Sequence, residues 1–564
     1  MKRIYLKLFC LTVVVILNGC TRDLDLSPRD TLSDASFWNT PSDFQRAANS
    51  LYVSLPGFAL FDTDSDIAFN QPNSVSNSTW TTPETDNDNW NTRYTRIRNS
   101  NTLIDRATDS PIADDVKVYV AEAKFFRAFN YWLLYSRFGG VPLVTKRLDI
   151  DSPELYGARH TAKQTVDFIL SDLQDAVADL PEENQVSAAN KGRITKGAAN
   201  ALRARVALFE GSWLKSRGLS GANEYFDIAI AAANTVISSS QYSLFEIPGD
   251  NESYRKLFDE QGRNSSETIL ARRHERNIAG HAFPQSMQQN GLLPTKQLAD
   301  MYLCMNGLPI IDNPMFQGYE GFDTEFIDRD PRMWQTIMIP GTVAYAALMA
   351  DPVPHWPFNP NRVWTTGYIN YKYVIQNPDY VMPPLHLQQN THRIVIRYAE
   401  VLLILAEATF ERFDEINDIV LGNTINLLRA RAGLTTPLTN DFVTNNNLDM
   451  REEIRRERTV ELALEGFRRD DLRRWKTAET ELVKAIRGIK IVGTQWGTEP
   501  IIIGDTDRNV YSEPSWQNRT DAEGFIISET ASYRESFDPE KHYLHPIPAR
   551  EILLNQRLEQ NNKW

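Results

Sequence analysis

Residues 115–142, DVKVYVAEAKFFRAFNYWLLYSRFGGVP, decide the fold class of this chain. Large and small apolar side chains recur at helical spacing between Tyr119 and Tyr135. Two glycines and a proline then interrupt the pattern, and such residues commonly follow the end of a helix. The stretch therefore predicts a long helix over residues 115–138 that stops abruptly.

The same periodicity recurs on both sides of this stretch and predicts further helices. They are expected from Pro41 onward and over residues 94–107, 161–180, 192–215, 223–240, 392–413, 422–432 and 448–477. Alanines such as Ala198, Ala201 and Ala204 would let neighbouring helices approach closely. Consecutive helix pairs of about 34 residues with small residues at their crossings are typical of a tetratricopeptide-like array.

Two long segments lack this periodicity. Residues 58–92 are rich in Asn, Thr, Asp and Ser, which predicts a long surface loop. Residues 245–391 are rich in Pro, Gly, Asn and aromatic residues and predict a loop-rich insertion with few short strands. We therefore expect one mainly α domain over 41–564, whose parts are a helical array at 41–244 and 392–478, the insertion, and an irregular C-terminal segment at 479–564.

The N-terminus reads as an export signal. Basic residues precede a short apolar run, 8–17, which is too short to span a bilayer as a stable helix. The next residues complete the sequence LNGC at 17–20, which resembles a bacterial lipobox. We expect residues 1–19 to be a cleaved signal peptide, Cys20 to carry lipid, and residues 20–40 to form a polar tether.

Composition narrows the function. The chain has 564 residues, 42% of them apolar, and 60 Lys plus Arg against 73 Asp plus Glu, a formal charge of −13. This excess of negative charge would repel a polyphosphate, so nucleic acid is not an expected partner. Of the three cysteines, only Cys304 follows Cys20, so no disulfide is expected within the mature chain.

Catalytic motifs are absent from the sequence. It contains no H-E-x-x-H, G-x-S-x-G or C-x-x-C, and Ala198 and Ala199 stand where a phosphate loop needs Lys and Ser or Thr. The acidic run that begins at Asp62 resembles the opening of a calcium loop, but Ile67 replaces its turn glycine. We expect no catalytic residue, metal or cofactor. A glycoside hydrolase stays open as an alternative, because sequence does not reveal the spacing of two carboxylates.

Aromatic residues in the irregular segments are candidates for sugar binding, because sugar rings stack on aromatic planes and sugar hydroxyls need polar neighbours. Trp80, beside Asn77 in a polar loop, is the first candidate, and Trp356 and Trp364 of the insertion are the next. Core packing is the competing interpretation for each of them. It is the expected one for Trp90 and for the tyrosines at 368, 371 and 373. If Trp80 is an exposed platform for sugar, we expect its replacement to leave the stability of the fold nearly unchanged.

Several blocks occur in a fixed order along the chain: AEAKFFRA at 121–128 running to FGGVPL at 138–143, GRITKGAA at 192–199, DRDPR at 328–332, IRYAEVLL at 396–403 followed by AEA at 406–408, ERTVELALEG at 457–466 with DLRRW at 471–475, and PIP at 546–548. Behind a lipobox, this order resembles the SusD/RagB family of outer-membrane lipoproteins from Bacteroidetes. Charged residues inside these blocks, such as Arg397, Glu400 and Glu407, are expected to form buried ion pairs that fix how helices cross.

The resemblance implies a function as well as a fold. It implies a lipoprotein of the bacterial outer membrane, facing the cell exterior, that captures a glycan and delivers it to a TonB-dependent β-barrel transporter (SusC-like). An oligopeptide, as in the RagB branch, is the alternative cargo.

Overall fold

The computed structural model describes residues 37–344, 353–355, 365–376, 388–498, 501–503, 506–508, 518–534 and 536–564. Three residues named above, Cys20, Trp356 and Trp364, lie outside these ranges. None of the described helices is long and apolar enough to cross a membrane.

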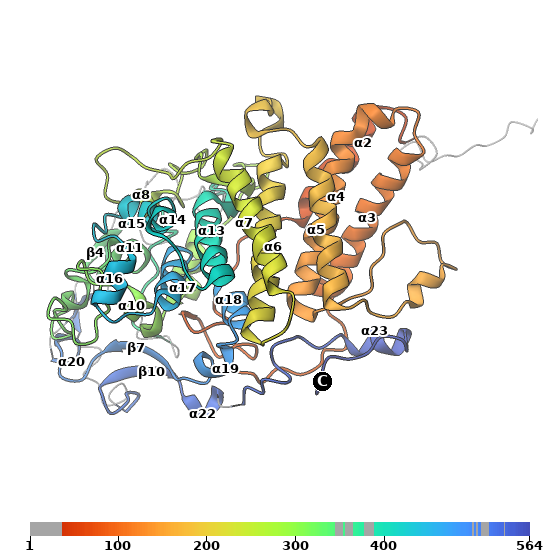
Figure 1. The fold of residues 1–564 in the computed structure, drawn as a ribbon. Helices are drawn as coiled ribbons and strands as arrows, with labels where there is room; N and C mark the ends of the chain where they lie inside the picture. Colours follow the sequence, from red (N-terminus) through yellow and green to blue (C-terminus); the bar gives the residue numbers. More distant parts are fainter. Residues whose placement is uncertain are drawn as a thin grey trace, which may run out of the picture.

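The first half of the chain folds into the helices that the sequence predicts. They are α2 (Pro41–Leu51), α3 (Thr92–Thr108), α4 (Ala113–Phe138), α5 (Ala162–Asp179), α6 (Lys196–Ser216) and α7 (Ala222–Ser238). Figure 1 shows α3 to α7 side by side. Thr40 and Thr161 begin α2 and α5 with capping boxes. Gly139 ends α4 at a φ of 72°, a conformation that glycine adopts without strain.

The array continues across the insertion into the second half of the chain. Helix α7 packs against α13 (Tyr398–Phe413), which in turn packs against α17 (Met450–Glu461). One apolar core runs through α2 to α7 and includes Val401 and Ile404 of α13. The expectation of a mainly α helical array is confirmed.

Two predicted helices of the second half are wrong in detail. Residues 393–397 form strand β6 (Arg393–Arg397), which pairs antiparallel with β2 (Thr268–Arg272), and α13 begins only at Tyr398. The β-branched run of β6 favours a strand. Residues 448–477 form two helices, α17 and α18 (Arg468–Arg474), because Leu464 and Gly466 adopt positive φ angles of 62° and 91° between them.

The described residues of the insertion form only short elements, as expected. Its helices and strands are α8 (Ser253–Lys256), β2, α9 (Phe283–Asn290), β3 (Leu293–Pro294), α10 (Lys296–Met301), α11 (Pro331–Thr336), β4 (Thr342–Ala344) and β5 (Val353–His355). Tyr368, Tyr371 and Tyr373 are buried there, so the expectation of core packing is confirmed for them.

The remaining elements are short as well. They are α14 (Asp418–Gly422), α15 (Ile425–Ala432), α16 (Asn440–Asn445), α19 (Ala478–Glu481), β7 (Ile486–Lys490), α20 (Gln495–Thr498), β8 (Ile501–Ile503), β9 (Thr506–Arg508), β10 (Phe525–Glu529), α22 (Ala531–Arg534) and α23 (Ala549–Leu554). The strands of the described residues pair two by two, all antiparallel: β1 (Ala68–Phe69) with β3, β2 with β6, β4 with β5, β7 with β10, and β8 with β9.

The expected surface loop at 58–92 is instead largely built into the protein. Residues 65–69 are buried, and Trp90 lies in the core, as predicted for that residue. The polar side chains find partners inside the fold: Asp66 forms an ion pair with Arg468 at 2.8 Å, and Asp62 accepts the backbone N–H groups of Gly466 and Arg468. These polar groups form their hydrogen bonds and ion pairs within the protein, so the polar composition of residues 58–92 does not place the whole segment at the surface.

Buried ion pairs hold the helices of the array together, as the sequence predicts. Arg205 of α6 binds Glu400 of α13 at 2.6 Å, and Glu407 of α13 binds Arg474 of α18 at 2.7 Å. Arg397 lies at the end of β6 and binds three glutamates, Glu267, Glu461 and Glu465, at 2.7–2.8 Å.

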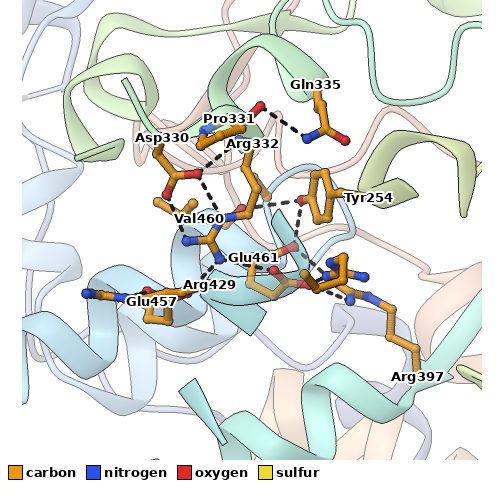
Figure 2. Close-up of polar contacts among 12 residues, drawn as sticks. Tyr254, Asp330, Pro331, Arg332, Gln335, Arg397, Arg429, Glu457, Val460 and Glu461 are labelled. Carbon is orange, nitrogen blue, oxygen red and sulfur yellow. Dashed lines mark hydrogen bonds and ion pairs between the residues drawn. The ribbon is translucent and has the colours of Figure 1, made fainter. Parts of the chain in front are cut away.

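Figure 2 shows where this network meets the insertion. Arg332 of α11 forms ion pairs with Glu457 and Glu461 of α17. Burial alone would raise the pKa of Glu461, but the charges of Arg431, Arg397 and Arg332 hold that pKa well below its ordinary value. Glu461 therefore stays ionised inside the protein.

Candidate functional site

Trp80 lies in an aromatic cluster between the loop after β1 and the C-terminal segment. Its ring is half-buried. It stacks on Trp564 with 5.5 Å between ring centroids and 24° between planes, and on His545 with 5.6 Å and 25°. His542 packs against the same ring at 4.9 Å. Residues almost 500 positions apart thus form one aromatic platform.

Arg469 of α18 lies against this platform. Its guanidinium carbon is 5.3 Å from the centroid of the Trp80 ring, a cation–π distance. Burial and the nearby cations Arg473 and Arg137 lower the pKa of Arg469 to about 10, against the pull of Asp64. Arg469 remains protonated at neutral pH.

Trp80, Arg469 and Arg473, the last of which lies near Arg469 on α18, carry donor groups without acceptors among the described residues. Within the described part of the chain, Trp80 Nε1, Arg469 Nε and Arg473 Nη2 are buried and form no hydrogen bond. Buried donors are normally paired, so these groups can bind acceptors that the chain itself does not supply, such as those of water or a ligand. Hydroxyl oxygens are acceptors of this kind.

Two carboxylates supply the complementary acceptors. Asp64 lies 3.7 Å from Arg469 Nη1, and Asp470 lies 3.2 Å from Arg473 Nη1. Each of these carboxylate side chains is 38% exposed, whereas the two arginine side chains are buried. Exposed acceptors beside buried donors and an aromatic ring can bind a group that both donates and accepts, such as a pair of sugar hydroxyls.

The other predicted site residues lie elsewhere or outside the described ranges. Asn77 is buried, its Nδ2 donates to Glu529 Oε1 at 3.0 Å, and its Oδ1 accepts from the Thr79 hydroxyl at 2.7 Å. In this structure the Asn77 amide fastens the loop to β10. Trp356 and Trp364 fall outside the described ranges, so their part in the site stays a prediction.

The sequence alone does not place Asp64, Arg469, Asp470, His542, His545 or Trp564 in this cluster. Asp64 belongs to the acidic run that resembles a calcium loop, and Arg469 and Asp470 lie between the two family-like blocks at 457–466 and 471–475. The described residues contain no group of three or more His, Cys, Asp or Glu side chains that could hold a metal ion. The one available signal was a tryptophan, Trp564, in an otherwise polar terminal stretch.

Comparisons with known proteins agree with this fold. The family model described as "SusD family" matches residues 245–564, and one described as "Starch-binding associating with outer membrane" matches residues 58–208. A SusD-like protein of Formosa agariphila is 25% identical over 540 residues, covering 88% of this chain and 96% of the relative. A SusD-like protein of Bacteroides ovatus is 24% identical over 294 residues, covering 48% of this chain and 50% of the relative.

Solved structures share the architecture. A SusD-like carbohydrate binding protein of Bacteroides fragilis superposes with a TM-score of 0.72 at 24% identity, covering 93% of this chain and all of that one. A laminarin binding SusD-like protein superposes with a TM-score of 0.57 at 20% identity, covering 93% of this chain and 99% of that one. At these identities the likeness shows the fold. Because the SusD model spans more than half of the sequence, this chain belongs to the SusD family.

Proposed function

We propose that this protein is a glycan-binding lipoprotein of the bacterial outer membrane that captures oligo- or polysaccharide without cleaving it. Two solved relatives of the same fold are described as carbohydrate binding and as laminarin binding, which supports glycan as the cargo. The predicted lipid on Cys20 would hold the protein at the cell surface. A TonB-dependent β-barrel is the partner to which it would deliver the glycan.

The Trp80 cluster is the observation that carries this proposal. Trp80 and Trp564 stack on each other and both remain partly exposed, so a sugar ring would pack against the aromatic surface that they leave open. Unpaired donors on Arg469 and Arg473 lie beside the exposed carboxylates of Asp64 and Asp470. A sugar hydroxyl could therefore accept a hydrogen bond from an arginine and donate one to a carboxylate.

Binding to defined polysaccharides tests the site. We expect calorimetry against a panel that includes laminarin and starch to find at least one ligand. Asp64→Asn and Asp470→Asn should each weaken that ligand by about tenfold, since a hydrogen bond to a charged group contributes roughly 1.5 kcal/mol. Glu224→Gln, a change on the exposed face of α7, serves as the matched control. Unchanged affinity in both aspartate variants would move the site away from Trp80.

Product analysis tests the absence of cleavage. Incubation with the bound polysaccharide should release no reducing ends over hours. Release that disappears in the Asp64→Asn or Asp470→Asn variant would favour the glycoside hydrolase alternative. Binding of oligopeptides but of no glycan in the panel would favour the peptide alternative.

Co-purification tests the partner. The lipidated protein, extracted in mild detergent, should bring down a β-barrel of larger mass, because a permanent complex buries more than about 2,000 Å² and survives extraction. Recovery of the protein alone from several detergents would contradict the proposed delivery step.

A further inference from the structure

A second polar cavity lies at the opposite end of α6 from the Trp80 cluster. Its volume is about 240 Å³, and it lies where residues 191–193, just before α6, meet β2 and His392. The other end of α6 contacts α18, where the Ser216 hydroxyl donates to the backbone carbonyl of Arg474. A helix of 21 residues spans about 30 Å, so the two places are separate.

Positive charge dominates the lining of this cavity. Lys191, Arg193, Arg263 and Arg273 line it. Arg193 is satisfied by Glu122 at 2.6 Å, and Arg263 is satisfied by Glu275. Among the described residues, no ion pair with a carboxylate is found for Lys191 or Arg273. Glu183 also lines the cavity and interacts electrostatically with Lys191, so Arg273 is the lining cation that is least compensated.

His392 adds a buried donor to the same lining. Its Nδ1 accepts the backbone N–H of His274 at 3.2 Å, so the neutral ring carries its proton on Nε2. Burial and the charges of Arg273 and Arg263 lower the pKa of His392 to about 3, so the ring is neutral at physiological pH. Within the described ranges, Nε2 is buried and has no hydrogen-bond partner. This N–H group needs an acceptor.

Backbone geometry fixes Arg273 at the cavity. Gly192 has a φ of 93°, and a Cβ atom there would lie 2.4 Å from Cδ of Arg273. The Arg273 side chain therefore lies directly over Gly192, and its Nη1 donates to the carbonyl of Lys191 at 3.2 Å. Because this hydrogen bond is to an uncharged carbonyl, it positions the Arg273 guanidinium without neutralising its positive charge.

We propose that this cavity is a second binding site, for an oxyanion such as the carboxylate or sulfate group of an acidic sugar. Arg273 and Lys191 supply charge and His392 supplies the N–H donor. Small-molecule pockets usually start near 300 Å³. A cavity slightly below that size fits one acidic substituent rather than a whole oligosaccharide. The site is independent of the Trp80 cluster and of the cargo proposed for it.

Calorimetry on the full chain with four small probes tests this site: glucuronate, glucose 6-sulfate, inorganic sulfate and glucose. The sugar acids should bind and weaken as salt is raised, whereas glucose should not bind. Arg273→Gln and Lys191→Gln should each lower their affinity by about tenfold. Arg412→Gln on α13, which removes an ion pair with Asp227 of α7, is the matched control and should have no effect.

Two readouts separate binding at the cavity from other causes. Nitrogen NMR should shift the His392 Nε2 signal on addition of glucuronate, and melting curves should show that the variants remain folded. Inorganic sulfate that binds as tightly as glucose 6-sulfate would identify the free anion as the ligand of the same site. Equal binding of glucose and glucuronate, or unchanged affinity in both cation variants, would overturn the proposal whatever the Trp80 cluster binds.

Discussion

Nη1 of Arg332 lies 2.6 Å from Oε1 of Glu457, although the two residues are 125 positions apart in the chain. Both side chains are buried, and Arg332 also binds Asp330 at 2.8 Å. The contact joins α11 of the insertion to α17 of the array. These charged side chains are removed from water, so the loss of one of them would leave an opposite charge buried without a partner.

Removing one carboxylate from this network should destabilise the fold strongly. Glu461→Gln leaves Arg332, Arg397 and Arg431 without their shared partner. We expect the free energy of unfolding in urea to fall by about 3–5 kcal/mol. Glu452→Gln on the same helix removes a 62% exposed carboxylate and should cost less than about 1 kcal/mol. Equal losses in the two variants would contradict a stabilising role for the buried network.

Acid should weaken the contact between α13 and α18. Burial alone would raise the pKa of Glu407, but the charges of Arg474 and Arg458 and a hydrogen bond from Trp475 lower it to about 2. The pKa is lower in the folded than in the unfolded state, so the stabilisation is complete above about pH 4.5 and is lost as pH falls toward 2.

The shift corresponds to about 3 kcal/mol. Urea titrations between pH 5 and 2 should therefore show a steeper loss of unfolding free energy in the wild type than in Glu407→Gln. Identical pH slopes would show that Glu407 titrates normally in the folded protein.

The glycine pair after α4 should tolerate substitution poorly. A Cβ atom on Gly140 would lie 2.1 Å from the carbonyl oxygen of His160, which belongs to the backbone and has no room to move. Gly140→Ala should lower the free energy of unfolding by more than about 2 kcal/mol, within the range of strained core changes. At Gly422 nothing lies within 4 Å of such an atom, so Gly422→Ala should be neutral or slightly stabilising. Similar melting temperatures for the two variants would refute this contrast.

Trp80 should matter for stability as well as for binding. The expectation that an exposed Trp80 is dispensable does not fit a half-buried ring stacked on Trp564 and His545. Trp80→Ala should cost about 1–3 kcal/mol of unfolding free energy. It should also weaken the glycan by about three- to tenfold. Trp80→Phe, which keeps an aromatic face, should recover most of both, and failure to recover either would argue against stacking.

Lipid attachment is tested at Cys20. Cys20→Ala should move the protein from the detergent phase to the aqueous phase and abolish labelling with a radioactive fatty acid, because Cys20 is the predicted site of lipid attachment. Cys304→Ala is the matched control, since Cys304 is buried and cannot carry lipid. Labelling that persists without Cys20 would place the lipid at another residue.

The helical part of the fold was predictable because its signals are local. The apolar periodicity of residues 115–138 and the glycine pair after them reproduce α4 to within two residues at its start. The break between α17 and α18 was not predictable from periodicity, because it depends on a positive φ at Leu464, a residue that rarely adopts one. The burial of residues 65–69 depends on partners such as Arg468, which lie hundreds of positions away.

The candidate site was predictable only in part for a similar reason. Trp80 was visible as an aromatic residue in a polar loop, but its neighbours Arg469 and Trp564 come from distant segments. Asn77 looked like a ligand group, yet its amide is used for an internal hydrogen bond to Glu529. Local sequence shows which residue types are available and does not show which of them the fold has already engaged.

The packing of α7 against α13 also constrains the order in which the chain can fold. A polypeptide is synthesised from its N-terminus, so α7 can form before α13 has been made. Until then, α7 lacks the helix from the second half of the chain that packs against it. An intermediate that folds before residues 398–413 are available therefore leaves the α13-facing side of α7 uncovered, and a chaperone that shields such a face would raise the yield of folded protein.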